Sequence, residues 1–344
     1  MSKRKTLAIK FKYLGDVAIM VPALRALRAA HPDDEIHVLV ADDAQAILRN
    51  LDWIDRVWPL PRARGKWKVA RSLRLIRELR QQRFDRSVDF VGNDRGAWLS
   101  RLIGAKERLG VRPAKGFRWR RLLYKQTIEE LDTTRHETVR DWFVLKPWGI
   151  AAPTNWSLET QPDKQLFEAA LGTLPAGSVV AHLSTSQRKK EWPVARWAEV
   201  WAHHRERFPQ TPLLFSSGPS PREQQLLEDL RRVDPTIELF PPQPDLEHFL
   251  AMLGHAAAFI SGDTAPLHLA AGLGLPTVGL FGPTSAERWA PIGSAHQILR
   301  GSLCACSGHL SDCAAATRCI DAITPQQVMD ALARILEYAP VATR

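Results

Sequence analysis

The stretch LAIKFKYLGDVAIMVPALRALRAAHPDDEIHVLVA, residues 7–41, holds two apolar runs separated by a segment with helical periodicity. Residues 7–11 and 35–41 predict strands, and apolar residues three or four positions apart predict a helix over 17–30. Pro22 is expected early in this helix, where proline is tolerated. A strand, a helix and a strand in this order predict a parallel sheet with a crossover helix.

The same alternation continues along the rest of the chain. Residues 62–83 form a basic, helix-like stretch, and a strand over 87–91 and a helix over 98–103 are expected after it. Beyond residue 162 the patterns predict five strands and five helices. The strands are expected over 178–182, 212–216, 236–240, 258–261 and 276–281. The helices are expected over 194–208, 222–233, 246–255, 266–273 and 324–338.

Residues 147–162 lack periodicity and contain several prolines and a glycine, which indicates a linker. We therefore expect two doubly wound α/β domains, 1–155 and 156–344, that face a cleft. A chain of 344 residues is long enough for two such cores.

The charge of the chain is unevenly distributed. Residues 1–160 hold 32 Lys and Arg against 19 Asp and Glu, a net charge of +13, whereas residues 161–344 hold 15 against 18, a net charge of −3. This asymmetry favours an anionic partner for the first half: membrane lipid, nucleic acid or a phosphorylated substrate. A basic surface that is merely solvated is the alternative. No apolar run is long enough to span a bilayer, and residues 7–12, which follow the basic start, are too few and too charged for the core of a signal peptide, so we expect a cytoplasmic protein.

Two segments of the second half have features of a phosphate site. Residues 261–283, SGDTAPLHLAAGLGLPTVGLFGP, run from a strand into a helix whose amino end suits an anion, although Asp263 would repel a phosphate. Residues 182–193, HLSTSQRKKEWP, place hydroxyls and cations after another strand, as diphosphate recognition requires. The alternatives are that Asp263 or Thr264 is an ordinary helix N-cap, and that the second segment is a solvated loop.

The first turn, Tyr13-Leu14-Gly15-Asp16, lacks the three-glycine dinucleotide fingerprint, which disfavours ordinary NAD binding. The Asp16 carboxylate at the end of the first strand could serve as a general base, or Asp16 could be a plain helix N-cap. A cluster of thiols near the end of the chain has spacing unlike that of zinc fingers, so either a metal site or a group of reduced thiols fits it. The cluster consists of Cys304, Cys306, Cys313 and Cys319, with His309 among them.

Several segments together resemble the bacterial heptosyltransferases, glycosyltransferase family 9. They occur in the family's order, over nearly the whole chain. The matching segments are Leu14-Gly15-Asp16-Val17, Pro22-Ala23-Leu24, Lys190-Glu191-Trp192-Pro193, Asp263-Thr264 through His268, Phe281-Gly282-Pro283-Thr284, and Cys319-Ile320 with Ile323-Thr324-Pro325 and Val328.

This resemblance implies a GT-B fold of two Rossmann-like domains, with the acceptor on the first and the nucleotide sugar on the second. It implies inverting, metal-independent transfer of a heptose or related sugar from an ADP-sugar to a lipopolysaccharide core or lipid A acceptor, without a cofactor. Asp16 would be the catalytic base. Thr185, Ser186 and Lys190 would bind the diphosphate, Asp263, Thr264 and His268 would line the donor site, and Glu223 would meet the ribose. Ala265 departs from the family's usual glycine, and its methyl group narrows the approach to the backbone.

Four arginines spaced three residues apart, Arg71, Arg74, Arg77 and Arg80, are expected to contact acceptor phosphates or anionic lipid at the inner face of the inner membrane. A GT-B enzyme that uses another nucleotide sugar, or a sugar-nucleotide epimerase, would share the donor features. A nucleic-acid-binding module fits the pI near 9.7 but would leave residues 263–284 without a role. An inactive scaffold is disfavoured by the presence of Asp16 and Lys190.

Overall fold

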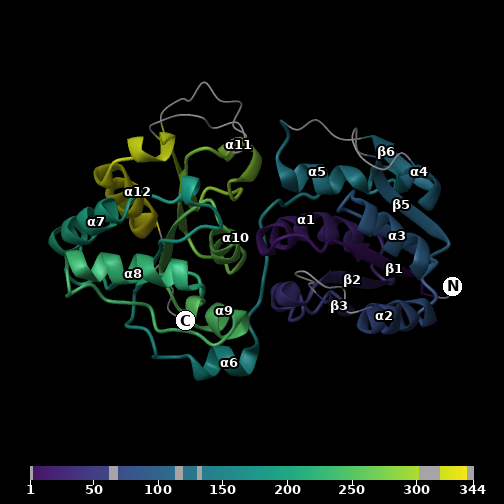
Figure 1. Ribbon diagram of the computed structural model, residues 1–344, viewed down its shortest axis with the longest axis horizontal. Coiled ribbons are helices and arrows are strands. Elements are labelled where there is room, and N and C mark those ends of the chain that lie inside the picture. Colours follow the sequence, from purple (N-terminus) through teal and green to yellow (C-terminus); the bar gives the residue numbers. More distant parts are fainter. Residues whose placement is uncertain (1–2, 62–68, 113–118, 130–133, 302–317, 339–344) are drawn as a thin grey trace. The chain divides into compact units, whose positions relative to one another are not determined.

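Figure 1 shows the computed structural model of the chain, which describes residues 3–61, 69–112, 119–129, 134–301 and 318–338. The chain divides into two compact units, Met1–Trp156 and Ser157–Arg344. Each unit is built on one parallel sheet that carries helices on both faces. The expected α/β architecture is therefore confirmed.

The sheet of the first unit has the strand order β3-β2-β1-β4-β5-β6. Its strands are β1 (Lys5–Ile9), β2 (Glu35–Ala41), β3 (Arg56–Leu60), β4 (Arg86–Asp89), β5 (Glu107–Arg112) and β6 (Gln126–Glu129). Its helical segments are α1 (Leu14–Ala30), η1 (Asp42–Ile47), α2 (Val69–Gln81), α3 (Asp94–Ile103), α4 (Arg120–Leu123), α5 (Glu137–Val144) and η2 (Lys146–Trp148). From β1 the chain adds β2 and β3 on one side of the sheet, and it then returns to add β4, β5 and β6 on the other side of β1. In doubly wound sheets ligands bind at such a switch point, beyond the carboxyl ends of the strands.

Helix α1 differs from its expected form at its start. It begins at Leu14 rather than at residue 17, so Pro22 is its ninth residue and lies in its interior. Proline there cannot donate to the carbonyl of Ala18. Burial compensates for this loss, because the helix is buried almost continuously from Gly15 to Leu24 and packs against α5.

The sheet of the second unit has the order β11-β10-β9-β7-β8. Its strands are β7 (Val179–His182), β8 (Leu213–Ser216), β9 (Ala258–Gly262), β10 (Thr277–Phe281) and β11 (His296–Arg300). Its helical segments are α6 (Lys164–Ala169), η3 (Arg188–Lys190), α7 (Val194–Arg207), α8 (Pro221–Val233), α9 (Leu246–Leu253), α10 (Ala265–Gly272), α11 (Ala286–Trp289), η5 (Cys319–Ala322) and α12 (Pro325–Tyr338).

Alternate residues of β7 belong to two different hydrophobic cores of the second unit. Val179 and Ala181 of β7 join the core beneath α7, α8 and α12, whereas Val180 joins the core beneath α6, α9, α10 and α11. Figure 1 shows these two groups of helices on opposite sides of the sheet. Both faces of β7 are buried, so the strand is held in place and the chain leaves the sheet after His182 in a fixed direction.

The prediction of a strand over 236–240 is wrong. Only Leu239 forms a bridge to Phe215, supported by hydrogen bonds from Phe215 N to the carbonyl of Glu238 (2.9 Å) and from Phe240 N to the carbonyl of Phe215 (2.8 Å). Pro235 and Pro241 flank the segment, and proline cannot donate to a ladder. This remnant lies beside β8, in the place that β3 occupies beside β2.

The other patterned strands and helices of the second half are present, with ends shifted by a few residues. Within the described ranges, no helix has the length and apolar character needed to cross a membrane. Cys319 is buried. The predicted thiol cluster otherwise falls on Cys304, Cys306, His309 and Cys313, which lie outside the described residues.

Candidate active site

A buried ionic group lies just past the carboxyl end of β9. The Lys190 Nζ atom is 2.6 Å from Asp263 Oδ2, and the two side chains are only 16% and 7% exposed. The second carboxylate oxygen, Asp263 Oδ1, is 3.8 Å from His268 Nε2, which lies on α10. The structure thus brings together three residues that the sequence nominated separately for the donor site. It also answers the objection to Asp263, whose negative charge is balanced by Lys190.

Tight packing holds the loop that carries Lys190 against β9. A Cβ atom on Gly262 would lie 3.2 Å from Thr185 Cγ2 and 3.3 Å from the Lys190 carbonyl oxygen. Any larger residue at this position would therefore push the loop away. The glycine that precedes Asp263 lets the two segments approach closely enough for the ion pair to form.

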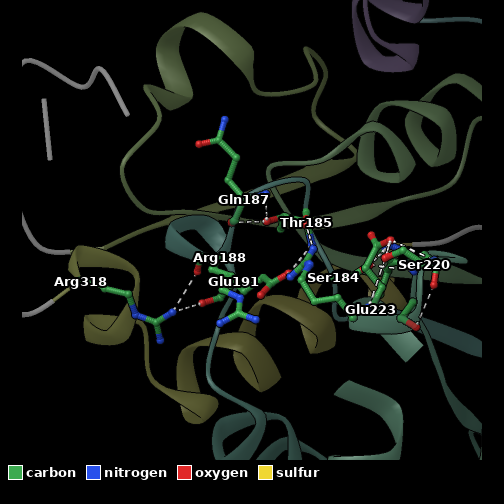
Figure 2. Close-up of polar contacts among 12 residues, drawn as sticks. Ser184, Thr185, Gln187, Arg188, Glu191, Ser220, Glu223 and Arg318 are labelled. Atoms are coloured by element: carbon green, nitrogen blue, oxygen red, sulfur yellow. Dashed lines mark hydrogen bonds and ion pairs between the residues drawn. The ribbon is translucent and has the colours of Figure 1, made fainter. Parts of the chain in front are cut away.

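Polar contacts also brace the loop from within (Figure 2). Glu191 Oε1 accepts hydrogen bonds from Thr185 N (3.1 Å) and from Arg222 Nη1 (2.6 Å), and Arg222 Nη2 donates to the Thr185 carbonyl (2.6 Å). Arg318 Nη1 donates to the carbonyls of Arg188 (3.1 Å) and Glu191 (2.9 Å). The loop is therefore fixed before any ligand arrives, unlike the solvated loop considered as the alternative.

The two hydroxyls predicted to bind diphosphate differ in their surroundings. The Thr185 hydroxyl donates to the Gln187 carbonyl (2.7 Å) and is buried, so it can donate to a phosphate only by giving up that bond. Ser186 is exposed at the tip of the same loop.

Glu223 lies in the first turn of α8 and has a structural role there. Its Oε2 atom accepts hydrogen bonds from the Ser220 hydroxyl (2.5 Å) and from the Ser220 backbone N–H (3.3 Å). The Glu223 backbone N–H donates in turn to the Ser220 hydroxyl oxygen (3.4 Å), which completes a capping box (Figure 2). A Cβ atom on Gly218 would lie 2.3 Å from Glu223 Oε1, so the loop after β8 also packs closely on this carboxylate. The capping box uses the Oε2 atom of Glu223, and the Oε1 atom has no part in it.

A chain of hydrogen bonds joins the ends of β7 and β8. The two ring nitrogens of His182 contact Ser216 Oγ (2.9 Å) and Ser184 Oγ (3.2 Å), and Ser184 Oγ accepts from Gly218 N (2.8 Å). Burial lowers the pKa of His182 to about 4, against a weaker opposing effect of Glu223, so its ring is neutral at neutral pH. His182 thus links the two loops without adding charge to the site.

The amino end of α10 has fewer donors than its sequence position suggested. Thr264 occupies the N-cap position but makes no side-chain cap hydrogen bond, so it is not an ordinary cap. Pro266, at the second position of the helix, has no N–H. The amides of Thr264 and Ala265 are therefore the donors nearest to Asp263 at this helix end.

In the first unit, Asp16 lies at the carboxyl end of β1 within a second buried ionic cluster. Asp16 is the third residue of α1, not its N-cap, and its carboxylate accepts a hydrogen bond from the backbone N–H of Tyr13 (3.3 Å). Lys10 forms a buried ion pair with Asp141 on α5, and Glu137 lies one helical turn before Asp141. Only 9% of Asp16 is exposed.

Charges within this cluster influence one another strongly. Burial favours the neutral form of Lys10, but Asp141, Asp16 and Glu137 more than offset it, and the pKa of Lys10 is raised. Burial also raises the pKa of Asp141 to about 6, although the Lys10 ammonium opposes this shift. The pair is therefore ionic at neutral pH. Sequence analysis missed Lys10, which lies in an apolar run, and its partner is 131 residues away.

The four predicted acceptor arginines are exposed along α2. Arg74 Nε pairs with Glu78 Oε1 (2.9 Å), and Arg80 Nη1 donates to the carbonyl of Leu102 (3.0 Å) on α3. Arg71 and Arg77 are exposed on the same helix, whose buried side holds Leu75, Ile76 and Leu79. All four therefore lie on the outward side of α2.

Within the described part of the chain, no group of three or more His, Cys, Asp or Glu side chains has an arrangement that could hold a metal ion. Lys190 places a positive charge beside Asp263. The residues that sequence analysis missed, Arg222 and Arg318 above all, position the loop and would not be recognised from spacing, because each contacts residues more than 30 positions away.

Two Rossmann-like domains in one chain, each with polar and ionic groups at the carboxyl ends of its parallel strands, are the architecture of the GT-B class. The chain belongs to glycosyltransferase family 9 (heptosyltransferase), whose model matches residues 72–313. The family resemblance drawn from the sequence motifs is thereby confirmed.

Individual relatives are similar along most of their length. Lipopolysaccharide heptosyltransferase 3 of Escherichia coli is 24% identical over 295 residues, which cover 81% of this chain and 84% of that protein. A family 9 glycosyl transferase structure from Veillonella parvula has a TM-score of 0.84 at 20% identity and covers 98% of both chains. E. coli heptosyltransferase WaaC, solved with ADP-2-deoxy-2-fluoro heptose, has a TM-score of 0.71 at 21% identity and covers 96% of this chain and 99% of its own.

Proposed function

We propose that this glycosyltransferase moves a heptose, or a closely related sugar, from an ADP-sugar to a phosphorylated lipopolysaccharide core or lipid A acceptor. Family membership and the name of the E. coli relative support the reaction class, and the ligand of the WaaC structure supports the donor. The observation that carries the proposal in this chain is the Lys190–Asp263 ion pair on a braced loop at the end of β9. In such a site the lysine ammonium is already in position to bind a diphosphate.

We propose that the second unit binds the donor. Lys190 donates to the diphosphate, and the amide groups at the start of α10 and the Ser186 hydroxyl add neutral donors. Thr185 joins them by exchanging its bond to Gln187. Asp263, Thr264 and His268 line the sugar, and the carboxylate of Asp263 favours positive charge that develops on the anomeric carbon. Glu223 meets the ribose through the carboxylate oxygen that its capping box leaves available.

We propose that the first unit binds the acceptor and that Asp16 is the base. The acceptor hydroxyl attacks the anomeric carbon opposite the diphosphate, Asp16 takes its proton, and the bond from the anomeric carbon to the diphosphate oxygen breaks. General-base help of this kind typically contributes about 10²–10⁴-fold. ADP leaves with the electron pair, and Lys190 stabilises its charge, so that the proposed reaction needs neither metal nor cofactor.

The proposed acceptor is a glycolipid, so we propose peripheral contact with an anionic membrane at the inner face of the inner membrane. Arg71, Arg74, Arg77 and Arg80 are the proposed contacts with acceptor phosphates. No nucleic acid is expected to bind, because the features of residues 263–284 serve a nucleotide sugar.

The experiment that tests the donor is a thermal-shift screen of the whole protein against ADP-, UDP-, GDP- and CDP-sugars. We expect the ADP-sugar to raise the melting temperature with increasing concentration, because a ligand that binds only the folded state stabilises it. A preference for a UDP-sugar would refute the donor, and product analysis would then separate a transferase from an epimerase.

The experiment that tests the base is Asp16→Ala, with ADP affinity as its control. We expect turnover to be lost and ADP binding to be nearly unchanged, since Asp16 lies in the other unit from the proposed diphosphate ligands. Retained turnover excludes Asp16 as the base. Transfer should also proceed in the presence of a chelator, and dependence on an added metal ion would contradict the proposed role of Lys190.

A further inference from the structure

Exposed apolar side chains gather on three helical segments of the first unit. Of eight large hydrophobic side chains that lie exposed among the described residues, five belong to α2, to α3, or to α4 and the residue before it. They are Leu73 (60% exposed), Trp98 (48%), Leu102 (40%), Trp119 (64%) and Leu122 (61%). Single exposed apolar residues are normal in soluble proteins, but a concentration of this kind marks an interaction surface.

These three helices form one layer. The chain crosses from β3 to β4, β5 and β6 in a single direction, and right-handed crossovers place α2, α3 and α4 on the same face of the sheet. Helix α3 lies between the other two in Figure 1. The bond from Arg80 to the Leu102 carbonyl joins α2 to α3, and Ala97 of α3 packs on Leu123 of α4. The exposed apolar residues therefore share the outward side of one layer.

Cations surround these apolar residues. Helices α2, α3 and α4 contain only two carboxylates among their described residues, Glu78 and Asp94. The exposed cations on these helices are Arg71, Arg74, Arg77, Arg80, Arg101 and Arg121. We call these cations, together with the five apolar residues, the α2–α4 surface. It combines tryptophan and leucine with a large excess of positive charge.

We propose that the α2–α4 surface docks on an anionic lipid bilayer, with Trp98, Trp119 and Leu122 in the headgroup boundary and the arginines on lipid phosphates. Tryptophan prefers that boundary because its ring is apolar and its N–H is polar, and basic residues are drawn to anionic headgroups. The inference rests on the proposed function, in which the acceptor is a membrane glycolipid.

Charge decides between this occupant and two others. A second copy of the chain would bring the same cations against themselves, and this repulsion disfavours a dimer through this surface. Nucleic acid would neutralise the cations but offers no apolar phase for Leu73, Leu102 and Leu122. An anionic bilayer meets both needs at once.

The test is sedimentation of the full chain with vesicles of phosphatidylcholine alone or mixed with phosphatidylglycerol. We expect binding only to the anionic vesicles, weakening as salt screens the cations. The double variant Trp98→Ser/Trp119→Ser should lower the partition coefficient by about tenfold or more, because two half-exposed aromatic rings no longer enter the boundary. Arg101→Glu/Arg121→Glu should lower it by a similar factor.

The matched control is Leu171→Ser/Val233→Ser, which removes two side chains that are 74% and 61% exposed in the second unit. This control should bind vesicles like the unchanged protein. A loss as large as that of the tryptophan variant would show that exposed apolar residues act without regard to place, and would overturn the inference. Unchanged vesicle binding by the tryptophan variant would overturn it equally.

Two further readouts separate this inference from its rivals. Dissociation of a dimer by the tryptophan variant in sedimentation equilibrium, or tryptophan-dependent binding of a single-stranded oligonucleotide in place of vesicles, would assign the surface to another partner. Transfer to an acceptor freed of its acyl chains should be the same for the tryptophan variant and the unchanged protein. If vesicles bind but no ADP-sugar does, the proposed function fails alone; if the ADP-sugar binds and vesicles do not, the docking surface fails alone.

Discussion

Replacement of Asp263 by asparagine should strengthen ADP binding while it weakens the fold. In the absence of ligand Lys190 is committed to Asp263 at 2.6 Å, and neither side chain has much contact with solvent. A diphosphate that reaches Lys190 must therefore share this cation with a carboxylate and tolerate that carboxylate beside it. Asparagine keeps the shape of the side chain and removes its charge.

The size of each effect follows from burial and charge. A carboxylate about 5 Å from a phosphate charge costs roughly 3 kcal/mol at an effective dielectric constant near 20. Partial exposure of Lys190 and screening by water reduce this, so we expect Asp263→Asn to gain about 1–2 kcal/mol in ADP binding, roughly tenfold in affinity. The same variant leaves Lys190 without its carboxylate. We expect it to lose about 1–3 kcal/mol of folding stability, less than for a fully buried pair because Lys190 can turn toward water.

The assay is calorimetric titration with ADP at a temperature far below unfolding, with denaturant unfolding measured separately. Lys190→Ala should move ADP binding in the opposite direction by about 1.5–3 kcal/mol, because it removes a charge-assisted hydrogen bond. The control is Asp330→Asn, which breaks an exposed ion pair with Arg207 in the same unit and should leave both stability and ADP affinity nearly unchanged. Weaker ADP binding by Asp263→Asn would refute the reasoning, since Asp263 would then help to hold the nucleotide.

Two further predictions concern the first unit. Asp141→Ala should lower the free energy of unfolding by about 3–5 kcal/mol, because it leaves the buried Lys10 without its carboxylate partner, and Lys10→Met combined with Asp141→Leu should recover most of this loss. Arg74→Ala, which breaks the exposed pair with Glu78, should lower it by less than about 1 kcal/mol in the same denaturant titration. Burial raises the pKa of Asp89 to about 6. Between about pH 4 and pH 6 the folded state therefore keeps a proton on Asp89 that the unfolded state has released. The free energy of unfolding should fall by roughly 3 kcal/mol as the pH rises across that window. Asp89→Asn should remove this part of the pH dependence, and an identical pH profile for the variant would contradict it.

Sequence patterns predicted the strands at the centre of each sheet and the edge strand β8, but missed β3, β5, β6 and β11. β1, β2, β7, β9 and β10 are buried on both faces, so they read as continuous apolar runs. β3 contains Pro59, β6 is mostly exposed, and β11 is only half-buried along its length, so none of them shows such a run. Edge strands owe their place to pairing with a neighbour, which a local pattern does not contain.

The proposed donor site was predictable as a set of residue types but not as an ionic arrangement. Sequence analysis nominates Lys190, Asp263 and His268 from separate segments, and the charge of Asp263 is unsuited to a phosphate site. The pair that resolves this difficulty joins residues 73 positions apart, and it depends on the close approach that Gly262 allows. Periodicity and spacing describe one segment at a time, so they cannot reveal which charges the fold will pair.

The two units use the same electrostatic device for different proposed tasks. In each, a lysine from the segment that follows a parallel strand is paired with a carboxylate from later in the chain: Lys10 with Asp141, and Lys190 with Asp263. A buried cation without such a partner would be costly and would bind any diphosphate tightly, product as well as substrate. In the proposed reaction, pairing lowers the affinity for ADP and leaves the cation in place for the charge that develops on the departing diphosphate. An enzyme gains rate only from interactions that strengthen in the transition state, so this internal competition favours turnover over retention of the product.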